Sequence, residues 1–326
     1  MRLIDVPKAF ATDEQCLAYL EAKRWPRGVR CPVCGAKEVS TITRTVDESS
    51  KKKQNKRKQL YQCLESTCKQ QFSATSGTIF HDSHLPLEKW FMAIALLVDA
   101  KKSMSALQLS RHLDCNYRTA WYLAHRIREA MVDADGPKMT GVVEVDETYI
   151  GGKQRGHKRK LRNKDVVIGV RERGGPVRLV HTKDATADTI FTVMRDHVSK
   201  DAEAIMTDDN PVYNFKMTQF RHVPHKTIKH RRHVYAKGNV YTNTVESAFS
   251  LFKRALVGSF HQVSIKHLQR YLNEFGYRFN RRETADMFEQ TVERMAGIGA
   301  MPYSKLIEQN AFTPFVRPAP KNAEPF

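Results

Sequence analysis

The chain has 326 residues, which is enough for one large domain or for several small domains with buried cores. Its formal net charge is +19, and lysine and arginine are in excess along the whole sequence, so the protein attracts polyanions such as nucleic acids. No apolar run reaches the roughly 18 residues of a membrane span, and residues 1–10 lack the apolar stretch of a signal peptide. We therefore expect a cytoplasmic protein with no membrane partner. On charge alone, a basic protein without a nucleic-acid role is the alternative.

Residues 1–30 are predicted to form an N-terminal helical segment. The sequence Thr12-Asp-Glu-Gln15 is typical of a helix N-terminus in which the threonine side chain caps the first turn. The sequence Trp25-Pro-Arg-Gly28 is expected to end this helix.

Two cysteine pairs lie in residues 31–80. Cys31 and Cys34 are separated by two residues and followed by glycine, a turn that in zinc ribbons directs two thiolates at one metal ion. Cys63 and Cys68 supply two further thiolates, which would complete a tetrahedral structural zinc site. A reducing compartment favours ligands or free thiols over disulfides. We predict a zinc ribbon over residues 31–80, with ordinary cysteines as the alternative.

Two spacings differ from the usual ribbon pattern. Four residues separate Cys63 from Cys68 where two are usual, and 28 residues separate the two pairs. The basic segment from Lys51 to Lys58 has no apolar side chain, so we interpret the long separation as a loop insertion. The remaining cysteines, Cys16 and Cys115, lie in helical patterns and are expected to be packed thiols.

Residues 81–135 are expected to be helical and to bind DNA. Two short helices, near 103–112 and 116–131, are joined by a break at which Asn116 is a candidate cap. Two helices joined by a tight turn, with basic residues on the second, are typical of a helix-turn-helix that reads a DNA groove. The basic residues of the second helix are Arg118, His125, Arg126 and Arg128. An ordinary helical bundle gives the same pattern and is the alternative.

From residue 141 the pattern changes to strands. Three β-branched runs are followed by a helical stretch at 186–199, a short buried strand that ends at Asp208, and a helical region from about 244 to 296. The β-branched runs are Val142–Asp146, Val166–Val170 and Val177–Val180. This order predicts a mixed α/β domain over residues 141–296, with a C-terminal tail at 297–326.

Three acidic residues of this domain are candidate metal ligands. Asp146 ends the first β-branched run, and Asp208 directly follows an apolar run, for which reason it is preferred over Asp209. Glu246 lies at the beginning of a helix. Two hard cations about 3.5–4 Å apart can activate the attacking oxygen and stabilise the leaving oxygen in phosphodiester cleavage. Carboxylates suit Mg²⁺ or Mn²⁺, so these acids predict a two-metal site, although any one of them alone is weak evidence.

Two neighbouring glutamates compete with these acids by position. Glu147 directly follows Asp146, whereas the alternation of a strand places Glu144 on the same face as Asp146. We therefore expect Glu144 to support the metal ligands from behind. Lys253 follows Glu246 by two helical turns and lies on the same face.

Together these motifs resemble the IS1595-type (ISXO2-like) insertion-sequence transposases over nearly the whole chain. The segments that carry the resemblance are Cys31-Pro-Val-Cys34-Gly, Phe72–Thr78, Val145–Lys153, Thr207-Asp208, Asn243–Ser247, Lys253-Arg254, Gly258–Ser264 and His267–Phe275. The combination is highly specific, whereas no single segment is.

The resemblance implies an RNase H-like catalytic core with an Asp-Asp-Glu/Asn triad. Carried over, Asp146, Asp208 and Glu246 bind two Mg²⁺ ions. Asn243 stays the alternative to Glu246, because relatives carry either residue type at the third position. Lys253, with Arg254 beside it, matches the basic residue that contacts the DNA backbone near the cut.

The resemblance also implies the function, that of a bacterial, nucleoid-associated transposase. The ribbon and the helix-turn-helix would bind the terminal inverted repeats, largely through phosphate contacts. The core would cleave the element's end and join the freed 3′-hydroxyl to target DNA. Both ends must be held together, so a homo-oligomer on DNA is expected. The alternatives are a DNA-binding regulator with a degenerate catalytic domain and an RNase H-like nuclease that does not join.

Overall fold

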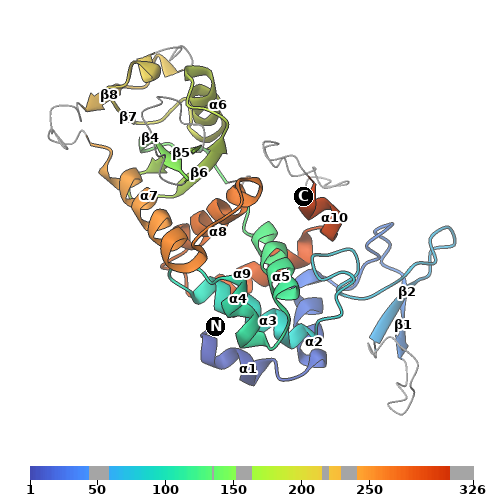
Figure 1. Cartoon of the computed structure of the whole chain (residues 1–326). Helices are drawn as coiled ribbons and strands as arrows, with labels where there is room; N and C mark the ends of the chain where they lie inside the picture. The colour runs from blue at the N-terminus through green and yellow to red at the C-terminus, as the bar shows by residue number, and fades with distance from the viewer. Residues whose placement is uncertain (44–58, 134–135, 152–163, 215–219, 229–240, 309–326) are drawn as a thin grey trace. The chain divides into compact units, whose positions relative to one another are not determined.

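The structure, a computed structural model, describes residues 1–43, 59–133, 136–151, 164–214, 220–228 and 241–308 (Figure 1). The chain forms two compact units that are interleaved in the sequence. The ribbon unit comprises Met1–Ala100, Ala106–Ala130 and Ala285–Ile307, and the sheet unit comprises Lys101–Ser105 and Met131–Thr284. The predicted loop from Lys51 to Lys58 lies outside the described residues. Among the helices described, none combines the length and the apolar character needed to cross a membrane.

The ribbon unit begins with short helices and a capped longer one. Its helices are η1 (Leu3–Asp5), α1 (Val6–Ala9), α2 (Asp13–Arg24), α3 (Leu87–Asp99), α4 (Ala106–Leu113), α5 (Tyr117–Ala130), α9 (Met287–Gly297) and α10 (Tyr303–Ile307). The predicted capping box of α2 is confirmed. The Thr12 hydroxyl accepts a hydrogen bond from the Gln15 backbone N–H at 3.3 Å, and the Gln15 side chain accepts one from the Thr12 N–H at 3.2 Å.

A small antiparallel sheet carries the second cysteine pair. Its strands are β1 (Val39–Thr43), β2 (Gln59–Cys63) and β3 (Gln71–Phe72), in the order β1-β2-β3. Tyr61 stacks on Phe72 across the sheet with ring centroids 5.6 Å apart, and the Trp25 ring meets both edge to face. These rings and the cysteines form a small core, consistent with the need of so small a sheet for a further cross-link.

Helix α9 belongs to the ribbon unit, although the sequence pattern assigned residues up to 296 to the strand-rich domain. It packs against α2, α3 and α5. Its buried face includes Phe288, whose ring centroid lies 5.9 Å from those of both Phe10 and Phe91. An amphipathic helix can bury its apolar face on any neighbour, and the sequence pattern does not say which one. The predicted tail likewise starts with a short helix, α10, and is described only to residue 308.

A five-stranded mixed sheet is the centre of the sheet unit. The strands, in the spatial order β6-β5-β4-β7-β8, are β6 (Val177–Thr182), β5 (Asp165–Glu172), β4 (Val142–Ile150), β7 (Ala204–Asp208) and β8 (His225–Ile228). Strands β4, β5 and β6 form an antiparallel meander, whereas β7 pairs in parallel with both β4 and β8. The parallel connection from the meander to β7 runs through helix α6 (Ala187–His197), as parallel pairing requires.

Helices cover both faces of this sheet (Figure 1). On one face α6 packs against alternate residues of β4 and β5, among them Val143 and Val145. On the other face lie α7 (Asn243–Ala255) and α8 (Leu268–Asn280). The π-helix η5 (Leu256–Phe260) and the 3₁₀ helix η6 (Ile265–His267) connect α7 to α8, and the 3₁₀ helix η2 (Pro211–Asn214) follows β7. The mixed α/β class predicted from the order of elements describes this unit.

Candidate functional site

Asp146 and Asp208 come from adjacent parallel strands. The register of β4 and β7 pairs Val142 with Ala204 and Glu144 with Met206. Continued by two residues, the same register brings Asp146 opposite Asp208, which is the last residue of β7. The parallel pairing thus brings the two aspartates side by side at the carboxyl end of β7. Open α/β sheets commonly build their sites at the carboxyl ends of parallel strands.

Asp146 lies in the middle of its strand, whereas the sequence pattern placed it at a strand end. The run of valines stops there, but β4 continues to Ile150, because β5 pairs with it as far as Ile150 opposite Asp165. Only the pairing with β7 ends before Asp146. The carboxylate is therefore attached to rigid backbone, at the point where the neighbouring strand stops.

The acids around Asp146 act on its ionisation. Burial and the neighbouring charges of Glu147, Asp208 and Glu246 together raise the pKa of Asp146 to about 7, although a 2.9 Å hydrogen bond from the Glu147 N–H opposes this shift. A strongly shifted carboxyl group among other acids is typical of functional sites.

The side chain of Glu246, in the first turn of α7, is held in place by a hydroxyl. Its Oε1 accepts a hydrogen bond of 3.0 Å from the Thr242 hydroxyl. Asn243, the alternative third member, is the first residue of α7 and is exposed. The charge of Glu246 acts on Asp146 and raises its pKa.

Lys253 reaches from α7 to the strand that carries Asp146. Its Nζ donates a hydrogen bond of 2.6 Å to the Thr148 hydroxyl. Burial lowers the pKa of Lys253, and the charge of Asp146 opposes that shift. Arg254, the next residue, is exposed, and its Nε donates to the Ser250 carbonyl at 3.4 Å. Both residues belong to α7, and the Lys253 side chain is the one that points toward β4 and Asp146.

The glutamates on either side of Asp146 have different partners. Glu144 is fully buried and bonds to the start of α7. Glu147 accepts a short hydrogen bond from the hydroxyl of Tyr213, which lies in η2 just after β7, and burial raises the pKa of Glu147. Strand alternation indicated Glu144 as a supporting residue, but no local pattern indicated Tyr213, because that contact joins residues 66 apart in sequence.

The four ribbon cysteines converge on one point. The sulfur atoms of Cys31, Cys34, Cys63 and Cys68 all lie within 4.8 Å of one another, and no other group of three or more possible metal ligands is this compact among the described residues. Cys31 Sγ lies 3.7 Å from Cys68 Sγ, and Cys34 Sγ lies 3.6 Å from Cys63 Sγ. Tetrahedral Zn–S bonds of about 2.3 Å separate two sulfurs by about 3.8 Å, so the cluster fits zinc.

The turn of the first pair favours a thiolate at Cys31, whereas burial raises the pKa of Cys63 to about 12. Burial opposes ionisation of Cys31, but backbone N–H groups of Cys34 and Val33 bond to its sulfur and lower its pKa to about 7. Gly35 has a φ of +78°, which permits the tight turn after the first pair. The wider second pair closes through a longer turn, in which the Cys68 and Lys69 N–H groups donate to the Glu65 carbonyl.

Two family models match this chain, one over the part that contains the cysteines and one over the part that contains the acids. The family model described as the transposase zinc-ribbon domain of IS1595 matches residues 11–71. The model described as the ISXO2-like transposase domain matches residues 138–280. The chain belongs to the IS1595 family of ISXO2-like transposases. The family resemblance found in the sequence is thereby confirmed.

A curated relative of this IS1595 chain comes from Halobacterium salinarum. It is described as an uncharacterized protein in transposable element ISH50 and is 27% identical over 289 residues, which cover 83% of this chain and 92% of the relative. No solved structure matches the chain. The detailed assignment of sites in this family member therefore rests on the geometry above.

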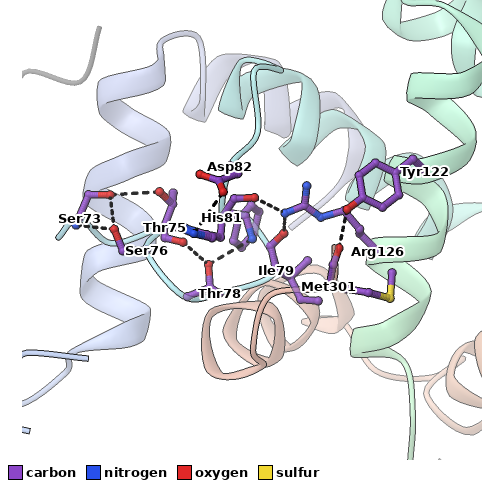
Figure 2. Close-up of polar contacts among 11 residues, drawn as sticks. Ser73, Thr75, Ser76, Thr78, Ile79, His81, Asp82, Tyr122, Arg126 and Met301 are labelled. Carbon is purple, nitrogen blue, oxygen red and sulfur yellow. Dashed lines mark hydrogen bonds and ion pairs between the residues drawn. The ribbon is translucent and has the colours of Figure 1, made fainter. Parts of the chain in front are cut away.

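The structure corrects two of the residues that we expected to bind DNA. Arg126 and Arg128 on α5 are 4% and 2% exposed, so neither guanidinium is available to a phosphate. As Figure 2 shows, Arg126 Nη2 donates to the carbonyls of Ile79 and His81, the latter at 2.6 Å. Helical periodicity alone placed these arginines on a polar face, but both are buried, and the segment that follows the ribbon covers Arg126.

The beginning of α5 agrees better with the expected DNA-binding helix. The Asn116 side chain accepts a hydrogen bond of 2.8 Å from the Thr119 N–H, so the predicted cap is present. Arg118, the second residue of α5, is exposed, as are Arg111 and His112 at the end of α4. Among the three α5 arginines named from the sequence, Arg118 alone keeps an accessible side chain.

Proposed function

We propose that this chain is a DDE-type transposase that cleaves the ends of its insertion sequence and joins them to target DNA. The observation that carries the proposal is the strand register that brings Asp146 opposite Asp208, together with the charge of Glu246 that acts on Asp146. The three acids come from β4, β7 and α7, and the second and third help to raise the pKa of the first to about 7. The family to which the chain belongs supports a transposase role.

We further assign the sheet unit to the RNase H-like class. Of the five strands in the order β6-β5-β4-β7-β8, only β5 runs antiparallel to the others. That arrangement, with the acids on the central strand, on its parallel neighbour and on a following helix, is the one expected of an RNase H-like core. It supports Asp146, Asp208 and Glu246 as the triad.

The proposed chemistry follows from these side chains. Asp146, Asp208 and Glu246 would hold two Mg²⁺ or Mn²⁺ ions, which supply activation of the attacking oxygen and stabilisation of the leaving oxygen. Lys253 donates from the same side and is suited to orient the phosphate that is cut. In the cleavage step water would attack the phosphorus at the element's end, and the P–O bond to the 3′-oxygen would break and free the 3′-hydroxyl. In the joining step that hydroxyl would attack a phosphodiester of the target and displace a 3′-hydroxyl of the target strand. Neither step needs a covalent bond between protein and DNA.

The ribbon unit is suited to bind the inverted repeats. Its cysteine cluster fits structural zinc, and α4 and α5 present exposed basic residues around their turn. We assign phosphate and base contacts to Arg118 and its exposed neighbours on this turn. Two copies of the chain would hold the two ends of the element.

The test is a cleavage assay on DNA that contains the element's end, in Mg²⁺ and in Mn²⁺. Asp146→Asn and Asp208→Asn should reduce cleavage by at least about 10³-fold, since each removes a ligand of the reacting ions, while binding to the end stays nearly unchanged. Asp209→Asn is the matched control and should cleave like the unaltered chain. Cleavage at the normal rate by Asp146→Asn would refute the assignment.

Two further outcomes separate this proposal from its rivals. A precut end that the protein joins to target DNA identifies a transposase, whereas cleavage without joining identifies a nuclease. Specific binding of the end with no cleavage under any metal condition identifies a DNA-binding regulator.

A further inference from the structure

Helix α7, which carries Glu246, does not provide its own N-terminal cap. The first backbone N–H groups of a helix need partners from outside the helix, and a threonine at the cap position usually supplies one. Thr242 occupies that position, but its side chain makes no capping hydrogen bond. Its hydroxyl instead donates to Glu246. The orphan N–H groups of α7 must therefore bond elsewhere.

A strand residue takes the place of the missing cap. Glu144 Oε2 accepts hydrogen bonds from the N–H groups of Thr244 at 2.9 Å and Val245 at 3.0 Å, and from the Thr244 hydroxyl at 2.8 Å. A carboxylate at this position is stabilised by the helix dipole and by charge-assisted bonds. Glu144 lies about a hundred residues earlier in the chain, so the cap joins β4 directly to α7.

The second oxygen of the same carboxylate is also paired. Glu144 Oε1 accepts from Arg173 Nε at 2.7 Å. Arg173 then donates to the Tyr241 carbonyl at 2.8 Å, and its guanidinium lies 3.6 Å from the centroid of the Tyr241 ring. A fully buried carboxylate is tolerated only when its charge and lone pairs are satisfied, and here both oxygens are.

The capping contact lies close in sequence to two members of the proposed triad, Asp146 and Glu246, and can therefore fix their relative position. On β4, Glu144 lies two residues before Asp146 and on the same face. On α7, Thr244 lies two residues before Glu246. A small displacement of the helix start from Glu144 would therefore move the Glu246 carboxylate relative to Asp146. Metal sites depend on such supporting contacts as much as on their ligands.

We propose that Glu144 is a positioning residue of the site, which caps α7 from β4 and so fixes Glu246 against Asp146 in a geometry that binds divalent cations. The inference rests on the proposed two-metal site. Glu144 itself does not bind the cations, because both of its oxygens are engaged with α7 and Arg173.

The first experiment measures the cap without any metal. Hydrogen exchange of the full chain should show slow exchange for the Thr244 and Val245 amides. Glu144→Ala should speed their exchange at least about tenfold, because no acceptor replaces the carboxylate. Glu274→Gln is the matched control: Glu274 is buried in α8 of the same unit and pairs with Arg278 at 3.3 Å. It should lower the melting temperature without changing exchange at 244 and 245.

The second experiment measures Mn²⁺ binding by calorimetry and cleavage as a function of Mn²⁺ concentration. Glu144→Gln keeps the shape but loses the charge, and it should weaken Mn²⁺ binding by about 10–100-fold, as loss of a supporting contact typically does. High Mn²⁺ should restore cleavage in Glu144→Gln but not in Glu246→Gln, which lacks a ligand. Glu274→Gln should bind Mn²⁺ like the unaltered chain.

A milder pair of variants protects the test against misfolding. Thr244→Ala removes one bond to Glu144 from a partly exposed position and should weaken Mn²⁺ binding several-fold, and Thr244→Ser should recover most of that loss. A folded Glu144→Gln that binds Mn²⁺ and cleaves like the unaltered chain would overturn the inference. An unaltered chain that neither binds Mn²⁺ nor cleaves would instead overturn the proposed function, while the exchange measurement still reports on the cap.

Discussion

Lys253 Nζ donates a 2.6 Å hydrogen bond to the Thr148 hydroxyl, and this bond joins α7 to β4 two residues beyond Asp146. Together with the Glu144 cap, it attaches α7 to β4 on both sides of Asp146. The helix that supplies the third acid is thus fixed at its start and again two turns later. The bond also holds the ammonium group close to the acids.

This relationship predicts different effects for its two partners. Lys253→Ala should weaken binding of end-containing DNA and lower the slope of log K against log salt by about 1, since one phosphate contact is lost. Thr148→Val should leave that slope unchanged, because the charge remains. The measurement is a salt titration of DNA binding by fluorescence anisotropy. An unchanged slope for Lys253→Ala would mean that Lys253 only supports the fold.

Gly169 sets how closely α7 approaches the sheet. It pairs with Asp146 across β4 and β5, and a Cβ there would lie 2.6 Å from Phe249 and 2.8 Å from Val245. Gly169→Ala should therefore lower the free energy of unfolding by about 1–3 kcal/mol through overpacking, and should weaken cleavage as α7 moves outward. Denaturant melts and the cleavage assay check both effects.

Gly276 in α8 provides the matched control for that substitution. A Cβ at this position would lie 3.7 Å from the Val177 carbonyl oxygen, an ordinary contact. Gly276→Ala should raise stability by about 0.5–1 kcal/mol, because alanine favours a helix over glycine. Equal losses for the two substitutions would contradict the role assigned to Gly169.

The two arginines of α5 should separate stability from DNA binding. Arg126→Ala leaves the Ile79 and His81 carbonyls without their donor, and should cost about 2–4 kcal/mol of folding free energy. Arg118→Ala should leave the melting temperature within about 1 °C but weaken DNA binding. Thermal melts and binding titrations of both variants test the distinction. Loss of DNA affinity by a stable Arg126→Ala protein would restore the original assignment.

The cysteine cluster predicts one zinc ion per chain. Cys63→Ser removes a buried ligand and should abolish zinc retention and lower the melting temperature of the ribbon unit. Cys115→Ser is the control, because Cys115 lies outside the cluster and should keep the metal. Elemental analysis of the purified proteins gives the result. Full zinc content in Cys63→Ser would contradict the four-cysteine site.

His197 predicts a loss of stability at acid pH. Burial and the nearby charge of Arg178, whose Nη1 lies 3.0 Å from His197 Nδ1, lower the pKa of His197 to about 4 from 6.5. Between pH 6.5 and 4 the unfolded chain gains a proton that the folded chain does not, so this group lowers stability as the pH falls through that window. The loss reaches at most about 3 kcal/mol.

Removing the ring should remove that contribution. His197→Gln should show a smaller decrease in melting temperature between pH 7.5 and 5 than the unaltered chain. The comparison requires only thermal melts at several pH values. Identical pH profiles would show that another group dominates the acid sensitivity.

The sequence by itself determined the local features of this protein. The Thr12 capping box, the Asn116 cap, the two cysteine pairs and the strand runs that lead to Asp146 and Asp208 are all read within short windows. Local propensity and side-chain chemistry decide these features, so they appear in the structure close to where the pattern predicted them. The family resemblance was carried by the same short segments.

The tertiary structure decided what each side chain meets. Periodicity gave Arg126 and Arg128 a polar face, but both are buried, and a segment some 45 residues away takes Arg126 as a donor. Strand alternation placed Glu144 on the same face as Asp146. Only the packing of α7 against β4 made Glu144 the cap of the helix that carries Glu246. Contacts between distant segments depend on which surfaces pack together. A local sequence pattern shows which face of a helix or strand is apolar, but it does not show which segment packs against that face.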